Sequence, residues 1–177
     1  MVSRKYVGDY RLENAVQPDG RLKTVPVYCG DWYVFCGGAE AVRRAKRIYA
    51  ALSALCAAMF VAVLLLNAGS GRFALAMLPF AAMVFPVFFA LAGSLRLILA
   101  GARVTREGRD KMQGRLAACA LFLAALSAAS AAGHAVYWRL NGAAPRDIAS
   151  LGATLAILAS AIAMFSLRRG LDMEKAA

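Results

Sequence analysis

The residues that could carry out chemistry are few and far apart in this chain of 177 residues. His134 is the only histidine, and the four cysteines do not form a CxxC pair. The paired aspartates of intramembrane proteases and the glycine-rich loops that bind phosphates are absent. An enzyme needs a nucleophile beside a base, or a metal held by clustered ligands, and this sequence offers neither pattern. The sequence therefore predicts a protein that is not an enzyme and that holds no cofactor or metal.

His134 lies one helical turn before Trp138, near the end of an apolar run. A lone histidine at such a place is expected to pack against its neighbours and to form a hydrogen bond with one of them. A metal site is the alternative, and for it the side of the membrane expected to face outward offers only Asp147, Asn141 and Asn67. We therefore interpret His134 as a structural residue.

Four uncharged apolar runs must position these residues, in a chain that is 61% hydrophobic against about 45–50% for an average soluble domain. They cover residues 48–66, 73–95, 116–138 and 148–167. A helix needs about 20 such residues to cross a bilayer. The sequence predicts an all-α membrane protein, an antiparallel four-helix transmembrane bundle over residues 38–177, with a basic connector at 96–115. A small β-rich segment at 1–37 precedes the bundle.

Basic residues flank the apolar runs unevenly. Nine Lys or Arg residues precede the first run, six lie in the connector and three follow the last run, whereas the two other loops hold one and two. Basic residues are retained on the cytoplasmic side of a membrane. The sequence therefore predicts a multi-pass protein with both termini in the cytoplasm, in the cell membrane of a prokaryote because the loops are short. Anionic lipid head groups are the expected partners of these charges, and nucleic acid is not.

Residues 1–37 are rich in β-branched and aromatic side chains, which favour strands. The Pro-Asp-Gly sequence at 18–20 predicts a turn. The Gly-Asp sequence at 30–31 predicts a two-residue hairpin, which places Tyr28 opposite Tyr33. The segment is thus expected to be a cytoplasmic β-hairpin or meander.

Both faces of this predicted hairpin are apolar. Its aromatic residues are Tyr28, Trp32, Tyr33 and Phe35. A meander of about 30 residues cannot bury two apolar faces by itself. The segment is therefore either a flap that rests on the bundle or the lipid interface, or a docking module whose aromatic side chains bind a partner.

Two prolines lie in the second apolar run, Pro79 and Pro86, about two helical turns apart on one face. Each removes a backbone hydrogen bond and bends a helix. The bend serves either as a hinge for gating or as a static kink that shapes packing, and the static kink is the simpler interpretation.

Small residues repeat at four-residue spacing in the last two runs. Gly152, Ala156 and Ser160 form such a stripe in the last run, and Ala129 and Gly133 belong to one in the third. In lipid, small side chains let two helix backbones approach closely. We expect these stripes to pack helices within one bundle or to join two copies of it.

By elimination, the sequence favours interaction over catalysis. We expect a non-catalytic integral membrane protein that serves as an accessory or regulatory subunit of a larger membrane assembly, for example a transporter complex. It would bind a membrane-protein partner or a second copy of itself. The alternative is a channel or small-solute transporter that the chain forms by self-assembly, with Pro79 and Pro86 as hinges for gating.

Overall fold

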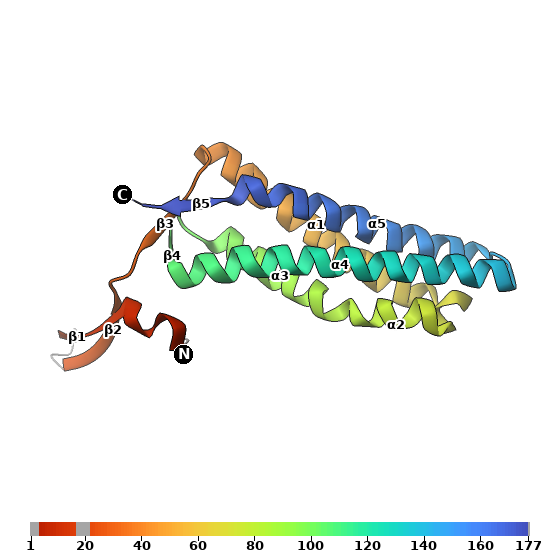
Figure 1. The fold of residues 1–177 in the computed structure, drawn as a ribbon, viewed down its shortest axis with the longest axis horizontal. Helices are drawn as coiled ribbons and strands as arrows, with labels where there is room; N and C mark the ends of the chain where they lie inside the picture. Colours follow the sequence, from red (N-terminus) through yellow and green to blue (C-terminus); the bar gives the residue numbers. More distant parts are fainter. Residues whose placement is uncertain (1–3, 17–21, 177) are drawn as a thin grey trace.

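The computed structural model describes residues 4–16 and 22–176, which form a bundle of long helices with β-strands at one end (Figure 1). The helices are α1 (Ala39–Leu66), α2 (Ala74–Ala82), α3 (Val84–Leu99), α4 (Arg106–Asn141) and α5 (Pro145–Leu167). Because α2 and α3 follow each other as one span, four segments are long and apolar enough to cross a membrane. By the length and composition of its helices, the prediction of an all-α membrane protein with four membrane-length helices is confirmed.

The helices begin and end where the local sequence favours it. α1 ends at Asn67, which adopts a left-handed backbone conformation with φ 43°, and asparagine is one of the few residues that tolerate it. α4 begins after Thr105, whose side chain accepts a hydrogen bond from the backbone N–H of Gly108 (3.2 Å). α5 begins at Pro145, whose fixed φ suits the first helical position.

The helices pack around an apolar core that runs through the bundle. α5 packs against α1 and α4, the span of α2 and α3 packs against α4, and α3 also contacts α1. The largest fully buried apolar side chains are those of Tyr49, Met83, Leu97, Leu123, Ile157 and Met164. The outside of the bundle is also apolar: Leu65, Phe85 and Leu99 are 79%, 69% and 82% exposed. Exposed apolar surface of this extent fits a lipid environment.

The described residues form five short strands, which lie at one end of the bundle that we call the sheet end. β1 (Tyr10–Val16) and β2 (Leu22–Tyr28) form an antiparallel ribbon that leads away from the helices (Figure 1). β3 (Trp32–Phe35) lies between β4 (Arg103–Thr105) and β5 (Met173–Lys175) and is antiparallel to both. β3 is thus paired on both edges, whereas the two strands of the ribbon pair only with each other among the described residues.

The predicted hairpin across residues 30–31 is wrong. β2 pairs with β1, so Tyr28 lies opposite Tyr10 and not opposite Tyr33. Both edges of β3 are already paired, one with β4 from the connector and one with β5 from the tail of the chain. No edge of β3 is therefore left for β2, and turn chemistry alone does not reveal competing strands from distant segments. The turn predicted at 18–20 lies outside the described residues.

Candidate functional site

The three-stranded sheet joins the beginning, the middle and the end of the chain. Two backbone hydrogen bonds extend the pairing of β3 with β5. The N–H of Cys36 donates to the carbonyl of Asp172 (2.9 Å), and the N–H of Ala176 donates to the carbonyl of Trp32 (2.8 Å). Backbone pairing of this kind holds the segment before α1, the connector and the tail together at the sheet end.

Two of the four aromatic residues predicted for docking attach this sheet to the helices. Tyr33 is buried, and the guanidinium carbon of Arg109 lies 4.5 Å from the centroid of its ring. Phe35 is half-buried, and the ammonium nitrogen of Lys46 lies 4.4 Å from its ring centroid. Lys46 also donates a hydrogen bond to the carbonyl of Ala100 (2.9 Å), just after α3. These cation–π contacts connect β3 to α4 and α1.

The other two aromatic residues, Tyr28 and Trp32, lie where the ribbon meets the sheet. Their rings meet edge to face with centroids 5.1 Å apart, and Tyr10 packs on Tyr28 in the same manner at 5.2 Å. The Tyr28 hydroxyl donates to the carbonyl of Asp31 (2.7 Å) and accepts a hydrogen bond from the N–H of Arg106 (3.0 Å). Tyr28 therefore links the ribbon to the start of α4. Trp32, at 40% exposed, is the most accessible of the four.

Ion pairs add to these contacts at the sheet end. The ammonium of Lys5 lies 3.0 Å from the carboxylate of Asp110, which also accepts a hydrogen bond from the Tyr6 hydroxyl (2.9 Å). The hydrogen bond from Lys5 holds the pKa of Asp110 below its ordinary value, and the same contact raises the pKa of Lys5. Lys175 pairs with Asp31 at 2.8 Å. Exposed pairs are weak and screened by salt, so they orient segments that the sheet already brings together.

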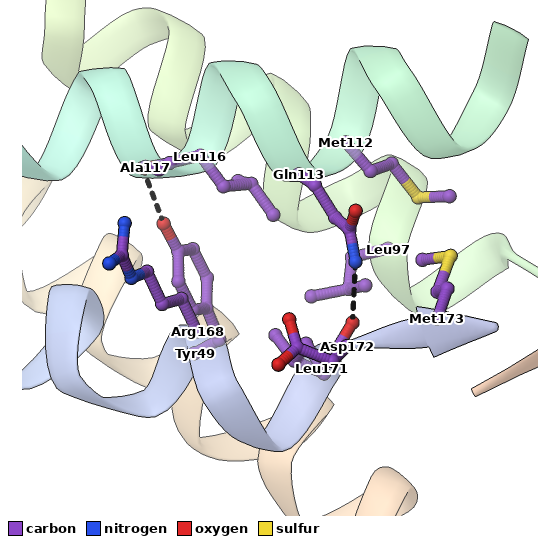
Figure 2. Close-up of a pocket in the computed structure, with 10 residues that line it drawn as sticks. All are labelled: Tyr49, Leu97, Met112, Gln113, Leu116, Ala117, Arg168, Leu171, Asp172 and Met173. Atoms are coloured by element: carbon purple, nitrogen blue, oxygen red, sulfur yellow. Dashed lines mark hydrogen bonds between the residues drawn. The ribbon is translucent and has the colours of Figure 1, made fainter. Parts of the chain in front are cut away.

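A cavity of about 340 Å³ lies at the sheet end, between α1, α3, α4 and the tail (Figure 2). Tyr49 donates a hydrogen bond to a backbone carbonyl of α4 (3.2 Å), and Gln113 donates one to a backbone carbonyl of the tail (3.4 Å). Arg168 and Asp172 add charged groups to a lining that is otherwise mainly apolar. None of the described residues that line it is a serine, cysteine, histidine or lysine. A mainly apolar lining with a few polar and charged groups suits the binding of a small molecule.

The helix is interrupted at Met83, between α2 and α3, close to both prolines from which a bend was predicted. Pro86 lies in the first turn of α3 and cannot donate a hydrogen bond to the carbonyl of Ala82, the last residue of α2. Pro79 lies within α2 and is half-buried. Met83 is fully buried, so the break is packed into the core. Movement about Pro79 and Pro86 stays a prediction.

Helices α4 and α2 approach each other closely at Gly133, where the backbone of α2 occupies the place of a side chain. A Cβ atom added to Gly133 would lie 2.5 Å from backbone atoms of Leu75 and Ala76. One turn earlier, the hydroxyl of Ser130 donates a hydrogen bond to the carbonyl of Ala76 (3.0 Å). Small residues thus permit close packing at this crossing.

The stripe of Gly152, Ala156 and Ser160 runs along α5 from an exposed position to a buried one. Gly152 is exposed, with no atom within 4 Å of the position of an added Cβ, while Ala156 is half-buried and Ser160 is buried. Within the described chain, the core face of α5 is formed by larger side chains such as Ile157 and Met164. Contact of Gly152 with a second copy stays a prediction.

The ribbon exposes apolar side chains on both strands. Leu12 and Leu22 are 72% and 73% exposed, and Val25 and Val27 are 37% and 38% exposed. Among the described residues, β1 pairs with β2 alone, so the outer edge of each strand carries unpaired backbone groups. The ribbon therefore presents both backbone and side-chain groups for an additional contact.

At the opposite end of the bundle, which we call the loop end, Asp147 ties two loops together. Its Oδ1 atom accepts hydrogen bonds from the backbone N–H (2.9 Å) and the hydroxyl (2.8 Å) of Ser70, in the turn Gly69–Arg72. Its Oδ2 atom accepts one from the N–H of Ala144 (3.3 Å). Asp147 is buried, and its three hydrogen bonds fix the turn after α1 against the start of α5.

Ser53 and Ser94 form a contact that our sequence analysis missed. Their hydroxyl oxygens lie 2.6 Å apart between α1 and α3. Each also lies within hydrogen-bond distance of a carbonyl of its own helix, so one serine donates across and the other donates back. The available signal was that each is the only serine of its apolar run.

Comparison with protein-family models, with curated proteins and with solved structures finds no match to this chain, so a function has to be inferred from the geometry.

Proposed function

We propose that the chain is a non-catalytic accessory or regulatory subunit of a larger membrane assembly, and that it binds its partner protein through the β1–β2 ribbon. The observation that carries this proposal is the exposure of Leu12 and Leu22 on strands whose outer edges no described residue covers. A two-stranded ribbon is only marginally stable in water. An additional strand from a partner would stabilise it.

One edge of the ribbon suits such a strand better than the other. Pro26 has no N–H to donate, and prolines in sheets lie on edges, so the outer edge of β2 is a poor template. β1 has no proline, so alternate residues over 10–16 offer both their N–H and their carbonyl at its outer edge. In the observed register Leu12 lies opposite Pro26, on the same face as Tyr10 and Tyr28. A strand added to β1 would pair with its backbone and contact this apolar face.

We further propose that the sheet end lies in the cytoplasm of a cell whose plasma membrane holds the bundle. Exposed basic residues near this end support the proposal, because basic residues are retained inside. They are Arg43, Arg44, Arg47, Arg96, Arg103 and Arg115. Anionic lipid head groups are the partners that these charges favour.

A groove on the outside of the bundle supports the lipid contact. It has a volume of about 500 Å³ and is lined by Phe85, Phe89 and Phe122, with Arg115 as its one charged residue among those described. It lies beside the break between α2 and α3, and Pro86 forms part of its wall. An acyl chain suits the aromatic wall, and a phosphate suits the guanidinium group.

A self-assembled channel is the second candidate function. Within one chain, buried side chains such as Met83, Leu123 and Ile157 fill the core between the two ends, so a conducting path would have to run between copies. The exposed Gly152, in a groove between α1 and α5, favours this candidate because a second helix could approach closely there.

Photo-crosslinking in cells that make the protein at its native level tests the proposal. A crosslinking amino acid at Leu12 is expected to give one discrete adduct with another protein, while the matched position Leu78, exposed on the outside of α2, gives none. The double variant Leu12→Ser, Leu22→Ser is expected to insert normally and to lose the partner. Purification of that partner should in turn retrieve the wild-type chain.

Two outcomes contradict the docking role of the ribbon. An adduct with the mass of two copies of this chain would favour self-assembly. The absence of any protein adduct at Leu12, with the chain correctly inserted, would remove the ribbon as a docking surface.

A further inference from the structure

A second cavity, of about 140 Å³, lies at the loop end between α1, the turn Gly69–Arg72, α2, α4 and α5. Its lining includes two buried polar residues, His134 (2% exposed) and Ser150 (1% exposed). It also includes Asn67 and Arg72, which are exposed and form its rim. The cavity is therefore polar at its base and at its rim.

The two buried residues have hydrogen-bonding capacity that the chain does not use. Nδ1 of His134 and Oγ of Ser150 have no hydrogen-bond partner among the described residues. The hydrogen bond that the sequence led us to expect for His134 is thus not made by this nitrogen. Burying a polar group without a partner is costly, and here two such groups line one cavity. A ligand that bonds to both would remove that cost.

The charges around the cavity indicate the charge of the ligand. Arg72 is the one charged residue among the described residues that line it. Asp147 interacts electrostatically with His134 but does not line the cavity, and its two oxygens are occupied by Ser70 and Ala144. A guanidinium group at the rim with no carboxylate facing it favours an anion, and a carboxylate matches its geometry.

The size of the cavity limits the ligand to a small molecule. A cavity of about 150 Å³ accommodates benzene, so a ligand of about six non-hydrogen atoms fits here. Apolar side chains, including that of Phe80, form the wall between base and rim. We propose that the loop end binds a small carboxylate with a second hydrogen-bonding group, such as a hydroxy acid. Its carboxylate lies against Arg72, and its hydroxyl bonds to His134 and Ser150. This site is independent of the proposed docking role of the ribbon.

The single histidine provides a direct readout of this site. In the purified full-length protein, labelled with ¹⁵N-histidine, 3-hydroxypropionate is expected to shift the imidazole resonances in a saturable manner at constant pH and ionic strength. Propionate lacks the hydroxyl and 3-hydroxypropionamide lacks the charge, so each is expected to bind about tenfold more weakly. Sodium chloride serves as the control for ionic strength.

Three variants locate the binding. Arg72→Gln and Ser150→Ala are each expected to weaken binding about tenfold, since each removes one of the ligand's contacts. Arg146→Gln, at the same end but not in the lining, is expected to leave it unchanged. Ser150→Ala should fold normally because its hydroxyl bonds to no described residue, and thermal unfolding checks this. Three results would overturn the proposal. The imidazole shifts with 3-hydroxypropionate could be no larger than those with sodium chloride, 3-hydroxypropionamide could bind as tightly as 3-hydroxypropionate, or Arg72→Gln could bind it as tightly as the wild type.

Discussion

At the scale of single residues, Gly133 decides how closely two helices approach. The backbone of α2 at Leu75 and Ala76 lies where a side chain of residue 133 would begin. Backbone atoms cannot rotate away as a flexible side chain can. The hydrogen atom of glycine is therefore the substituent that fits this crossing without a shift of one helix.

We expect Gly133→Ala to destabilise the protein, because α4 and α2 must separate to accept the added methyl group. Overpacking a tight contact costs about 1–3 kcal/mol. Thermal unfolding in detergent measures the effect. Gly152→Ala is the matched control, since open space surrounds Gly152, and it is expected to be neutral. Equal effects of the two changes would show that the crossing is not tight.

The hydroxyl pair of Ser53 and Ser94 is the second feature at this scale. We expect Ser53→Ala and Ser94→Ala each to weaken the contact of α1 with α3, and the double variant to lose little more than either alone. Hydrogen bonds between membrane helices average about 0.6 kcal/mol and reach about 1.7 kcal/mol. A double-mutant cycle of unfolding free energies measures the coupling. Fully additive losses would mean that the two serines act separately.

At the scale of elements, β3 is the strand that organises the sheet end. It has only four residues, yet both of its edges are paired and Tyr33 lies buried at its centre. β3 contacts the bundle through Tyr33 and Phe35, as a flap would, and the choice between flap and docking module stays a prediction. The ribbon, which precedes it, keeps the exposure that a docking module needs.

Replacing Tyr33 is expected to release the sheet from the bundle. Tyr33→Ala removes the ring that packs on Arg109, and truncation of a buried aromatic residue costs about 3–5 kcal/mol. We expect trypsin to cleave the purified protein after Arg103, in β4, more rapidly than in the wild type. Trp32→Ala, at a position 40% exposed, is expected to increase cleavage less. A larger effect at Trp32 would show that the tryptophan is the main anchor.

The elements differ in how far the sequence reveals them. Helices of membrane length follow from runs of apolar residues, which are a local property, and so all four could be predicted. β4 and β5 have three residues each and no local signal, and they form only because the helices bring residues 103–105 and 173–175 beside β3. The hairpin prediction failed for the same reason. The cavity at the loop end was equally hidden, since helix packing brings His134 and Ser150 to the lining of one cavity.

At the scale of the whole molecule, the two ends of the bundle are built differently. The sheet end gathers the beginning, the connector and the tail of the chain by backbone pairing. At the loop end, the buried carboxylate of Asp147 ties the turn after α1 to the start of α5. Because strands pair only with neighbours on the same side of a membrane, the sheet requires all three segments to share one compartment. The excess of basic residues predicts that this compartment is the cytoplasm.

Native cysteines allow this orientation to be measured without fusion proteins. Cys29 and Cys36 are exposed at the sheet end, whereas Cys56 and Cys119 are buried in the bundle. We expect a membrane-impermeant maleimide to label inside-out vesicles that contain the wild-type chain and to leave right-side-out vesicles unlabelled. The double variant Cys29→Ser, Cys36→Ser should lose the label. Adding Ala143→Cys to it places a thiol in the exposed loop between α4 and α5, and this thiol should react only in right-side-out vesicles. Labelling of Ala143→Cys from the same side as the native cysteines would contradict a bundle of four spans, since residues 36 and 143 would then be separated by an even number of crossings.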